Sequence, residues 1–434
     1  MARQWQEDII IRSDNPGIDA FGHLRVSLPE ALVAIISQYD NDPLELENGN
    51  TGVGVTPAHQ PTTRMVRLSA GAGTGTSFCQ TYVYWSYQPG RSQRIDMTGR
   101  FGVPVAGATM DYGYFDSENG LFLRQNGISG LQIVQRSKTS GSVVNTPVDQ
   151  TDWNLDKLDG LGPSGLTLDP TKVFLFITDL EFLGMGRVRL GFNIGGLVVY
   201  VHEFLHTNVS DVPYMQTATL PIQILLTTTS AAASSEMFFK GALVSSEGGL
   251  LKELGLTFAT PERTITAASG ARTHLLSVRP KLLFNGLTNR ESYITRTLEL
   301  CLSQGNGNPI FWELVAGANF SPDPTWVDVN AQFSGTEINI DGVFLNLTGG
   351  VVLKSGYVSA GNQGQNVTSV PLDLHHPLTL NRAGQHTSIG TLSLLVTGIG
   401  GTAATRASLN FTELRKGFYT CLFPIRSDAA SMRM

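Results

Sequence analysis

Short segments with the pattern of β-strands recur along most of this 434-residue chain. Two stretches, at about 78–245 and about 262–425, contain runs rich in β-branched and aromatic residues, bounded by Gly, Pro, Asn, Asp or Ser. In the first stretch the runs follow one another roughly every 10–15 residues, and helical periodicity is absent. The sequence therefore predicts an all-β protein with two tandem antiparallel β-sandwich or jelly-roll-like domains.

The composition argues against several classes of protein. The net charge is −6 and no dense cluster of Lys and Arg is present, so we expect no direct contact with nucleic acid. No apolar run reaches the roughly 18 residues of a membrane-spanning helix. Cys79, Cys301 and Cys421 are too few and too widely spaced for a disulfide framework or a zinc ribbon. The first residues do not resemble a signal peptide, and we expect folding in a reducing cytoplasm.

The chain divides into three parts by composition. We assign residues 1–60 to an irregular N-terminal arm that anchors the protein or contacts other subunits, 61–249 to the first sandwich, and 250–434 to the second sandwich with a C-terminal tail.

Local signals inside the arm predict little regular structure. Ser27 and Glu30 have the spacing of a capping box, and the apolar residues that follow fit either one short helix near 28–37 or an extended arm. Residues 50–75 are rich in Gly, Thr and Pro, so we expect a loop there.

The string His202-Glu203-Phe204-Leu205-His206 matches the H-E-x-x-H pattern of zinc proteases. In those enzymes the string lies on a helix, whereas here it continues a predicted strand. At about 3.3 Å per residue, His202 and His206 would lie about 13 Å apart, with Glu203 on the other face. One zinc ion needs ligands at about 2.0–2.1 Å, so we reject a metal site.

Two groups of acidic residues are candidates for a calcium site or a catalytic carboxylate pair. Asp152, Asp156 and Asp159 precede a glycine and could form a calcium loop, but their spacing does not match the usual pattern, and a structural loop is the preferred interpretation. Asp179 and Glu181 could form a carboxylate pair for glycoside hydrolysis, although surface acids have the same spacing. With no other catalytic string present, we expect neither enzymatic activity nor a cofactor.

Aromatic residues are concentrated at two places in the first stretch. We expect these aromatic residues to lie in the core or in a subunit contact, with glycan binding as the alternative. The residues are Tyr82, Tyr84, Trp85, Tyr87, Tyr112, Tyr114 and Phe115.

Several strings together resemble structural proteins of tailed-bacteriophage virions. The leader GIDAFGHLRVSLPE is similar to the D-A-F-G-R-L-R-V-S leader of minor structural proteins, with His23 in place of the usual Arg, and YQPGRSQRIDMTGRF resembles their Y-Q-P-G-K-S-Q segment. GYFDSENGLFLR, DQTDWNLDKLDGLGPSGLTLD, FLGMGRVRLGF, YMQTATLPI and SSEGG continue the resemblance, which spans about 18–249.

This resemblance implies a non-enzymatic component of a tailed-phage virion, in a collar, neck, tail, baseplate or fibre-like appendage. The alternatives are a host-receptor or glycan-binding virion protein and a polysaccharide hydrolase. Because only 15% of residues are charged, edge strands carry little charge that would prevent pairing with another chain, and we expect a homo-oligomer. The resemblance favours a trimer, because virion appendages of this general type are often threefold. Other virion proteins would bind the arm, a host surface glycan is a further partner, and assembly would take place in the host bacterial cytoplasm.

Overall fold

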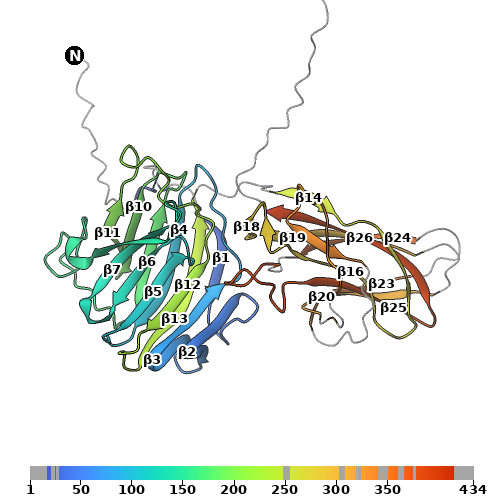
Figure 1. The fold of residues 1–434 in the computed structure, drawn as a ribbon, viewed down its shortest axis with the longest axis horizontal. Coiled ribbons are helices and arrows are strands. Elements are labelled where there is room, and N and C mark those ends of the chain that lie inside the picture. Colours follow the sequence, from blue (N-terminus) through green and yellow to red (C-terminus); the bar gives the residue numbers. More distant parts are fainter. Residues whose placement is uncertain are drawn as a thin grey trace, which may run out of the picture.

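The computed structural model describes residues 17–20, 25, 29–247, 255–302, 308–318, 320, 324–340, 350–359, 366–374 and 378–414. These residues form an all-β protein of curled antiparallel sheets in two sandwiches (Figure 1). The first sandwich also has two 3₁₀ turns, η1 (Gly127–Ser129) and η2 (Gln150–Asp152). Its strands are β1 (Glu30–Ile36), β2 (Leu46–Gln60), β3 (Met65–Thr81), β4 (Gln93–Phe101), β5 (Ala108–Phe115), β6 (Gly120–Asn126), β7 (Leu131–Ser137), β8 (Val144–Asp149), β9 (Phe174–Leu180), β10 (Val188–Ile194), β11 (Leu197–Phe204), β12 (Ile222–Thr228) and β13 (Ser235–Ser246).

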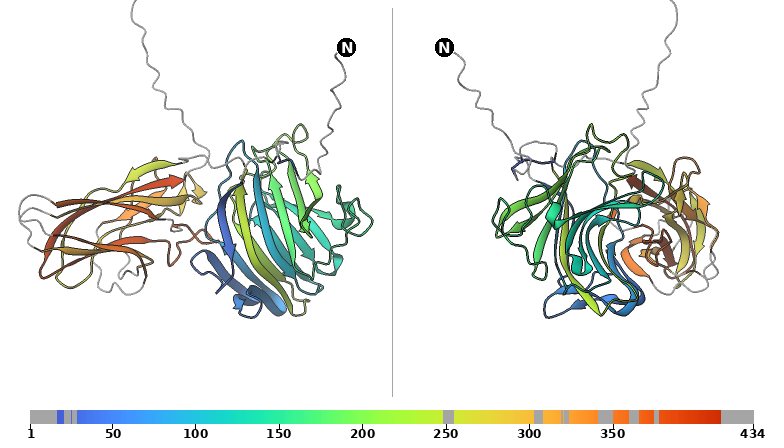
Figure 2. Two further views of the ribbon diagram at one scale, coloured as in Figure 1. Left: turned by 180° about the vertical axis from the view of Figure 1, so that it is seen from behind. Right: turned by 60° about the vertical axis from the view of Figure 1, so that its left-hand side comes forward.

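These strands make one 13-stranded sheet that folds over at β3 (Figure 2). The main order is β11-β10-β9-β4-β13-β3-β12-β5-β6-β7-β8, with β1 paired to β13 and β2 to β3. The first part of β3 pairs with β13 and the second part with β12, so this 17-residue strand belongs to both layers. The two halves of the sheet thereby enclose one core.

Aromatic contacts between the two halves fill this core. Tyr112 of β5 lies edge-on against Phe101 of β4 and Phe174 of β9, with ring centroids 5.2 and 5.4 Å apart. The burial of β4 alternates along the whole strand because successive side chains point to opposite faces. The predicted all-β, two-sandwich fold class is therefore confirmed.

The second sandwich consists of two larger sheets and a small hairpin. Its strands are β14 (Leu256–Ala259), β15 (Arg263–Ala267), β16 (Thr273–Pro280), β17 (Leu283–Phe284), β18 (Leu287–Thr288), β19 (Ser292–Leu302), β20 (Ile310–Ala316), β21 (Val327–Asp328), β22 (Thr336–Asn339), β23 (Val351–Val358), β24 (Asn366–Leu374), β25 (Leu392–Gly398) and β26 (Ala403–Leu414). One sheet has the order β14-β26-β19-β24 with β15 also on β26, and the other has the order β21-β22-β16-β25-β20-β23. The sheets share a core that includes Trp312, Leu394 and Phe411.

Of the two alternatives for 28–37, the short helix is wrong. Residues 30–36 form β1, which pairs antiparallel with 241–246 of β13. The apolar spacing of this segment fits a helix, but its β-branched residues also suit a strand, and hydrogen bonds to the open edge of β13 decide between the two.

The loop expected at 50–75 is also wrong, because β2 and β3 pair across most of it. Both β1 and β2 fall within the range assigned to an arm, yet they are strands of the first sheet. Residues 1–16, which carry most of the arm prediction, and the tail from 415 lie outside the described residues.

Arg290 joins the two sandwiches. It follows β18 of the second sandwich, and its guanidinium lies 4.3 Å from the ring centroid of Tyr84 in the first. Its two terminal nitrogens donate hydrogen bonds to the carbonyl oxygens of Asn381 (2.6 Å) and Arg382 (3.0 Å). Arg290 thus holds the 381–382 turn in place while stacking on the other sandwich.

The same turn makes a second contact with the first sandwich. The backbone N–H of Arg382 donates to Glu47 Oε2 at 2.6 Å. The Arg382 guanidinium lies over the ring of Phe78, 4.8 Å from its centroid. The contact between the sandwiches is therefore built from two stacked arginines and one carboxylate.

Candidate functional site

The histidines of the H-E-x-x-H string lie along the end of β11. His202 is in the strand, and His206 lies two positions beyond its last residue, Phe204. The ring of Phe204 lies 4.6 Å from that of His202 and 6.1 Å from that of His206, centroid to centroid. Both ring nitrogens of His206 have protein partners, Gly186 O at 2.7 Å and Gln135 Oε1 at 2.9 Å. In the part of the chain that the structure describes, no three His, Cys, Asp or Glu side chains are grouped to hold a metal ion.

Burial lowers the pKa of His202 from 6.5 to about 4, so we expect a neutral ring at pH 7. The folded state then binds fewer protons than the unfolded state, and stability should fall as the pH drops from 6.5 towards 4. An NMR titration of the imidazole signals, assigned with a His202→Gln variant, should show a midpoint near pH 4. A midpoint at the ordinary value, or a shift of these signals on adding zinc, would contradict this prediction.

The acidic residues of the 152–159 segment mostly accept backbone hydrogen bonds. Asp156 is buried, and its two oxygens accept from Leu158 N (2.8 Å) and Ser164 N (2.7 Å). Asp159 Oδ1 accepts from Leu161 N at 2.8 Å, while Asp152 lies in η2. Asp156 and Asp159 therefore act as turn-stabilising acceptors, as in ordinary Asx turns.

The aromatic residues at 82–87 lie beyond the end of β3, whose last residue is Thr81. Tyr84 and Tyr87 are nevertheless buried, and Trp85 packs against the core of the first sandwich. The second aromatic group, in β5, is completely buried.

The most enclosed charged group of the first sandwich is Asp179, in β9. Its Oδ2 accepts hydrogen bonds from Arg25 (2.5 Å), Arg189 (2.6 Å) and the hydroxyl of Tyr200 (2.8 Å). Its Oδ1 accepts from Ser92 Oγ at 2.9 Å. The side chains of Asp179 and Arg189 are both fully buried. We call this group of five residues the Asp179 cluster.

The described residues of the N-terminal leader, 17–20 and Arg25, contact the Asp179 cluster and its neighbours. Arg189 donates to Ile18 O at 2.6 Å, and Arg187 donates to Ala20 O at 3.2 Å. Ala20 N donates to Ser92 Oγ at 3.2 Å. The guanidinium of Arg25 also pairs with Glu247, with Arg25 Nε 2.8 Å from Glu247 Oε1. The leader is thus attached to β9, β10 and β11 by side chains that lie far apart in the sequence.

Asp179 has the surroundings of a structural carboxylate. Burial by itself would raise the pKa of Asp179, but the charges of Arg189 and Arg25 and the hydrogen bonds from Tyr200 and Ser92 hold it below its ordinary value. A general acid at neutral pH requires a raised pKa. Glu181, its sequence partner in the proposed carboxylate pair, lies just beyond the end of β9. The lowered pKa therefore argues against Asp179 as a general acid.

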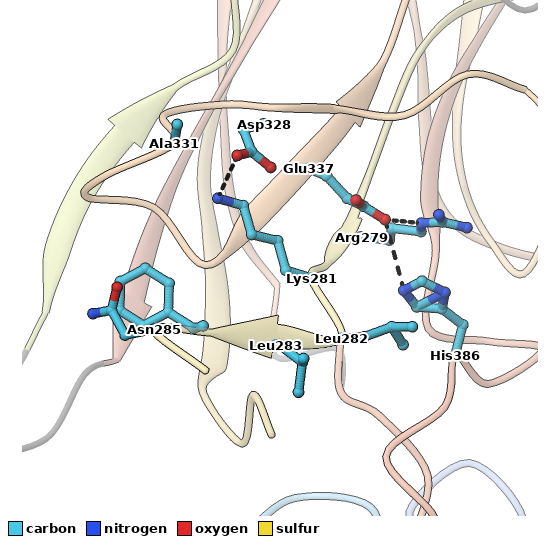
Figure 3. Close-up of a pocket in the computed structure, with 10 residues that line it drawn as sticks. Arg279, Lys281, Leu282, Leu283, Asn285, Asp328, Ala331, Glu337 and His386 are labelled. Atoms are coloured by element: carbon cyan, nitrogen blue, oxygen red, sulfur yellow. Dashed lines mark hydrogen bonds and ion pairs between the residues drawn. The ribbon is translucent and has the colours of Figure 1, made fainter. Parts of the chain in front are cut away.

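A cavity of about 430 Å³ lies in the second sandwich, next to the β17–β18 hairpin (Figure 3). Antiparallel register brings its charged residues together, because Arg279 of β16 and Asp328 of β21 both lie opposite Glu337 of β22. The lining residues are Arg279, Lys281, Leu282, Leu283, Phe284, Asn285, Asp328, Ala331, Glu337 and His386.

Ion pairs connect the charged residues of this cavity. Lys281 Nζ lies 3.1 Å from Asp328 Oδ2, and Arg279 Nε pairs with Glu337 Oε1. His386 Nε2 lies 2.9 Å from Pro280 O and 3.7 Å from Glu337 Oε1. Figure 3 shows the two ion pairs on adjacent walls of the cavity.

Sequence reasoning did not find this cavity, although one local signal was present. Asn285-Gly286 between short apolar runs is typical of a two-residue hairpin, and both residues have positive φ angles, +50° and +80°. That signal predicts the hairpin but not its neighbours, since Asp328, Glu337 and His386 come from later parts of the chain.

Comparison with known proteins gives similarity of shape only. No protein-family model and no curated protein matches this chain. Among solved structures, a glycosyl hydrolase family protein from Mycobacterium fortuitum is 11% identical, covering 50% of this chain and 99% of its own, with a TM-score of 0.33. A beta-1,3-glucanase from Mycobacterium marinum is 9% identical, covering 49% and 98%, with a TM-score of 0.35.

A legume lectin-like domain from Entamoeba histolytica is 6% identical, covering 49% of this chain and 95% of its own, with a TM-score of 0.29. At such low identities and TM-scores, none of these similarities assigns an activity to this chain. Across the described residues, no helix has the length and apolarity to span a membrane.

Proposed function

We propose that this chain is a non-enzymatic structural component of a tailed-phage virion. One observation supports the proposal. Residues from four of the segments that resemble virion structural proteins belong to the buried Asp179 cluster or contact it. Arg25 belongs to the leader, Ser92 to YQPGRSQ, Arg189 to FLGMGRVRLGF and Glu247 to SSEGG, and all four contact Asp179 or its partners. The resemblance therefore includes residues that build the fold, which supports a structural role.

Self-association fits the edges of the first sheet. β11 is poor in charge and lies at one end of the strand order, where β10 is its only partner strand among the described residues. Residues 154–156 hydrogen-bond to Val201 and Glu203 and so cover the second half of this edge. At the other end of the order, β8 pairs only with β7 among the described residues, and an open edge of this kind favours pairing with another chain. We propose a homo-oligomer, with a trimer as the favoured form, which light scattering on the purified chain would test.

Particles of the phage that encodes this chain provide the direct test of location. Mass spectrometry of gradient-purified virions should detect the chain at a constant copy number, and immunogold labelling should place it at one position on the particle. Absence of the chain from purified virions would overturn the proposal.

The arm is tested by a truncation chosen from the structure. Removing residues 1–50 would also remove β1 and Arg25, which belong to the sheet and to the Asp179 cluster. Removing only residues 1–16 keeps both. If the arm anchors the chain, the shorter protein should fold normally but fail to enter particles, whereas normal incorporation would exclude the arm as the anchor.

A further inference from the structure

The cavity next to the β17–β18 hairpin has a lining with no net charge. Lys281 pairs with Asp328, and Arg279 pairs with Glu337, so two positive groups meet two negative ones. Burial and the nearby Arg279 lower the pKa of His386 to about 4, which leaves its ring neutral at pH 7. A charged ligand would compete with ion pairs that already exist, and a neutral ligand would not.

The paired groups still offer hydrogen bonds to a ligand. Among the described residues Lys281 Nζ has two partners, Asp328 and the carbonyl oxygen of Asn330, which use two of its three N–H donors. Asp328 has 43% of its side chain exposed and uses only Oδ2 in the pair. Arg279 bonds Glu337 through Nε, and among the described residues its terminal nitrogens have no hydrogen-bond partner.

Apolar surface lies beside these polar groups. Leu282 and Leu283 line the cavity and are 45% and 58% exposed. Phe284, the next residue of β17, also lines the cavity. A ligand in this cavity would therefore meet donors and acceptors on one side and apolar side chains on the other, as is usual for small-molecule sites of this size.

We infer that this cavity binds a neutral carbohydrate, one hexose or N-acetylhexosamine unit of a larger glycan. A pyranose ring carries several hydroxyls around its rim, which match the donors and acceptors of Arg279, Lys281 and Asp328. Its C–H face is apolar and matches Leu283 and its neighbours on the hairpin. This inference does not depend on the virion proposal, because it concerns the purified chain alone.

Saturation-transfer difference NMR on the full chain tests the inference. The probes are neutral oligosaccharides ending in glucose, galactose or N-acetylglucosamine, with sialyllactose and a sulfated oligosaccharide as anionic comparisons. We expect signal transfer to at least one neutral oligosaccharide and weaker transfer to the anionic ones. No transfer to any neutral probe, or preferred binding of an anionic probe, would overturn the inference.

Two variants test whether the carbohydrate binds in this cavity. Asp328→Asn removes a charged acceptor, and we expect about a tenfold or greater loss of affinity. Leu283→Ser removes apolar surface and should also weaken binding. Glu262→Gln is the matched control, because it breaks an exposed ion pair of the same 3.1 Å length, with Arg406, outside the cavity.

The outcomes separate this site from any other. Each variant should keep the thermal melting curve of the parent chain, since Asp328 and Leu283 are both exposed. Unchanged affinity in both cavity variants would place the glycan elsewhere and contradict the inference. Equal loss in the Glu262→Gln control would do the same.

Discussion

Replacing Asp179 with asparagine should lower the free energy of unfolding by about 3–5 kcal/mol at pH 7, as for other buried ion pairs that lose one partner. The carboxylate has no exposed surface, and its loss removes the fully buried ion pair with Arg189. Urea unfolding of the parent chain and the Asp179→Asn variant measures the difference.

The control for this prediction is an exposed pair in the same sheet. Glu236→Gln breaks the contact between Arg67 Nε and Glu236 Oε2, which is 2.8 Å long but has side chains 45% and 38% exposed. Solvent screening should limit its cost to about 1 kcal/mol or less. Equal effects of Asp179→Asn and Glu236→Gln would show that the Asp179 cluster does not stabilise the fold.

The effect of Asp179 should also depend on pH. Because the folded-state pKa of Asp179 lies below its ordinary value of 3.8, its stabilisation is complete well above pH 3.8 and is lost as the pH falls through the lower folded-state value. The stability difference between the parent chain and Asp179→Asn should therefore shrink in acid.

Replacing Arg290 with methionine should uncouple the two sandwiches. The substitution removes two hydrogen bonds to the 381–382 turn and the stacking on Tyr84, at an expected cost of about 2–4 kcal/mol. Scanning calorimetry should show the two sandwiches unfolding in separate transitions, further apart than in the parent chain. Small-angle scattering should show a larger radius of gyration.

Arg406→Met is the control for the Arg290 prediction. Arg406 also belongs to the second sandwich, but it is exposed and pairs only with Glu262 among the described residues. We expect its variant to keep the calorimetric profile of the parent chain. If Arg290→Met keeps that profile as well, the arginine contacts do not couple the sandwiches.

Strand-forming segments with strong alternation were predictable from the sequence. In β4, for example, buried and half-buried residues alternate over the whole strand, and the turn residues on either side mark its ends. β1 was not predictable, because its apolar spacing also fits a helix, and the deciding hydrogen bonds come from β13, some 200 residues further along the chain.

The buried and cavity-lining charged groups were even less predictable, because they come together from segments that are distant in the sequence. Arg25 and Asp179 are 154 positions apart, and no local pattern relates them. Likewise, Asp328, Glu337 and Arg279 lie in one row across the sheet only because β21, β22 and β16 pair in one register. A shift of one residue would turn these side chains to the opposite face and remove the cavity's ion pairs.

The sequence by itself determined the class of fold, since period-two alternation and turn residues act over a few neighbouring positions. It also made a single-metal site at His202 and His206 unfavourable, because strand geometry separates residues four positions apart. Only the tertiary structure decided which charges are buried together and where a cavity opens. Both result from strand order and register, which depend on contacts between residues that are distant in the chain.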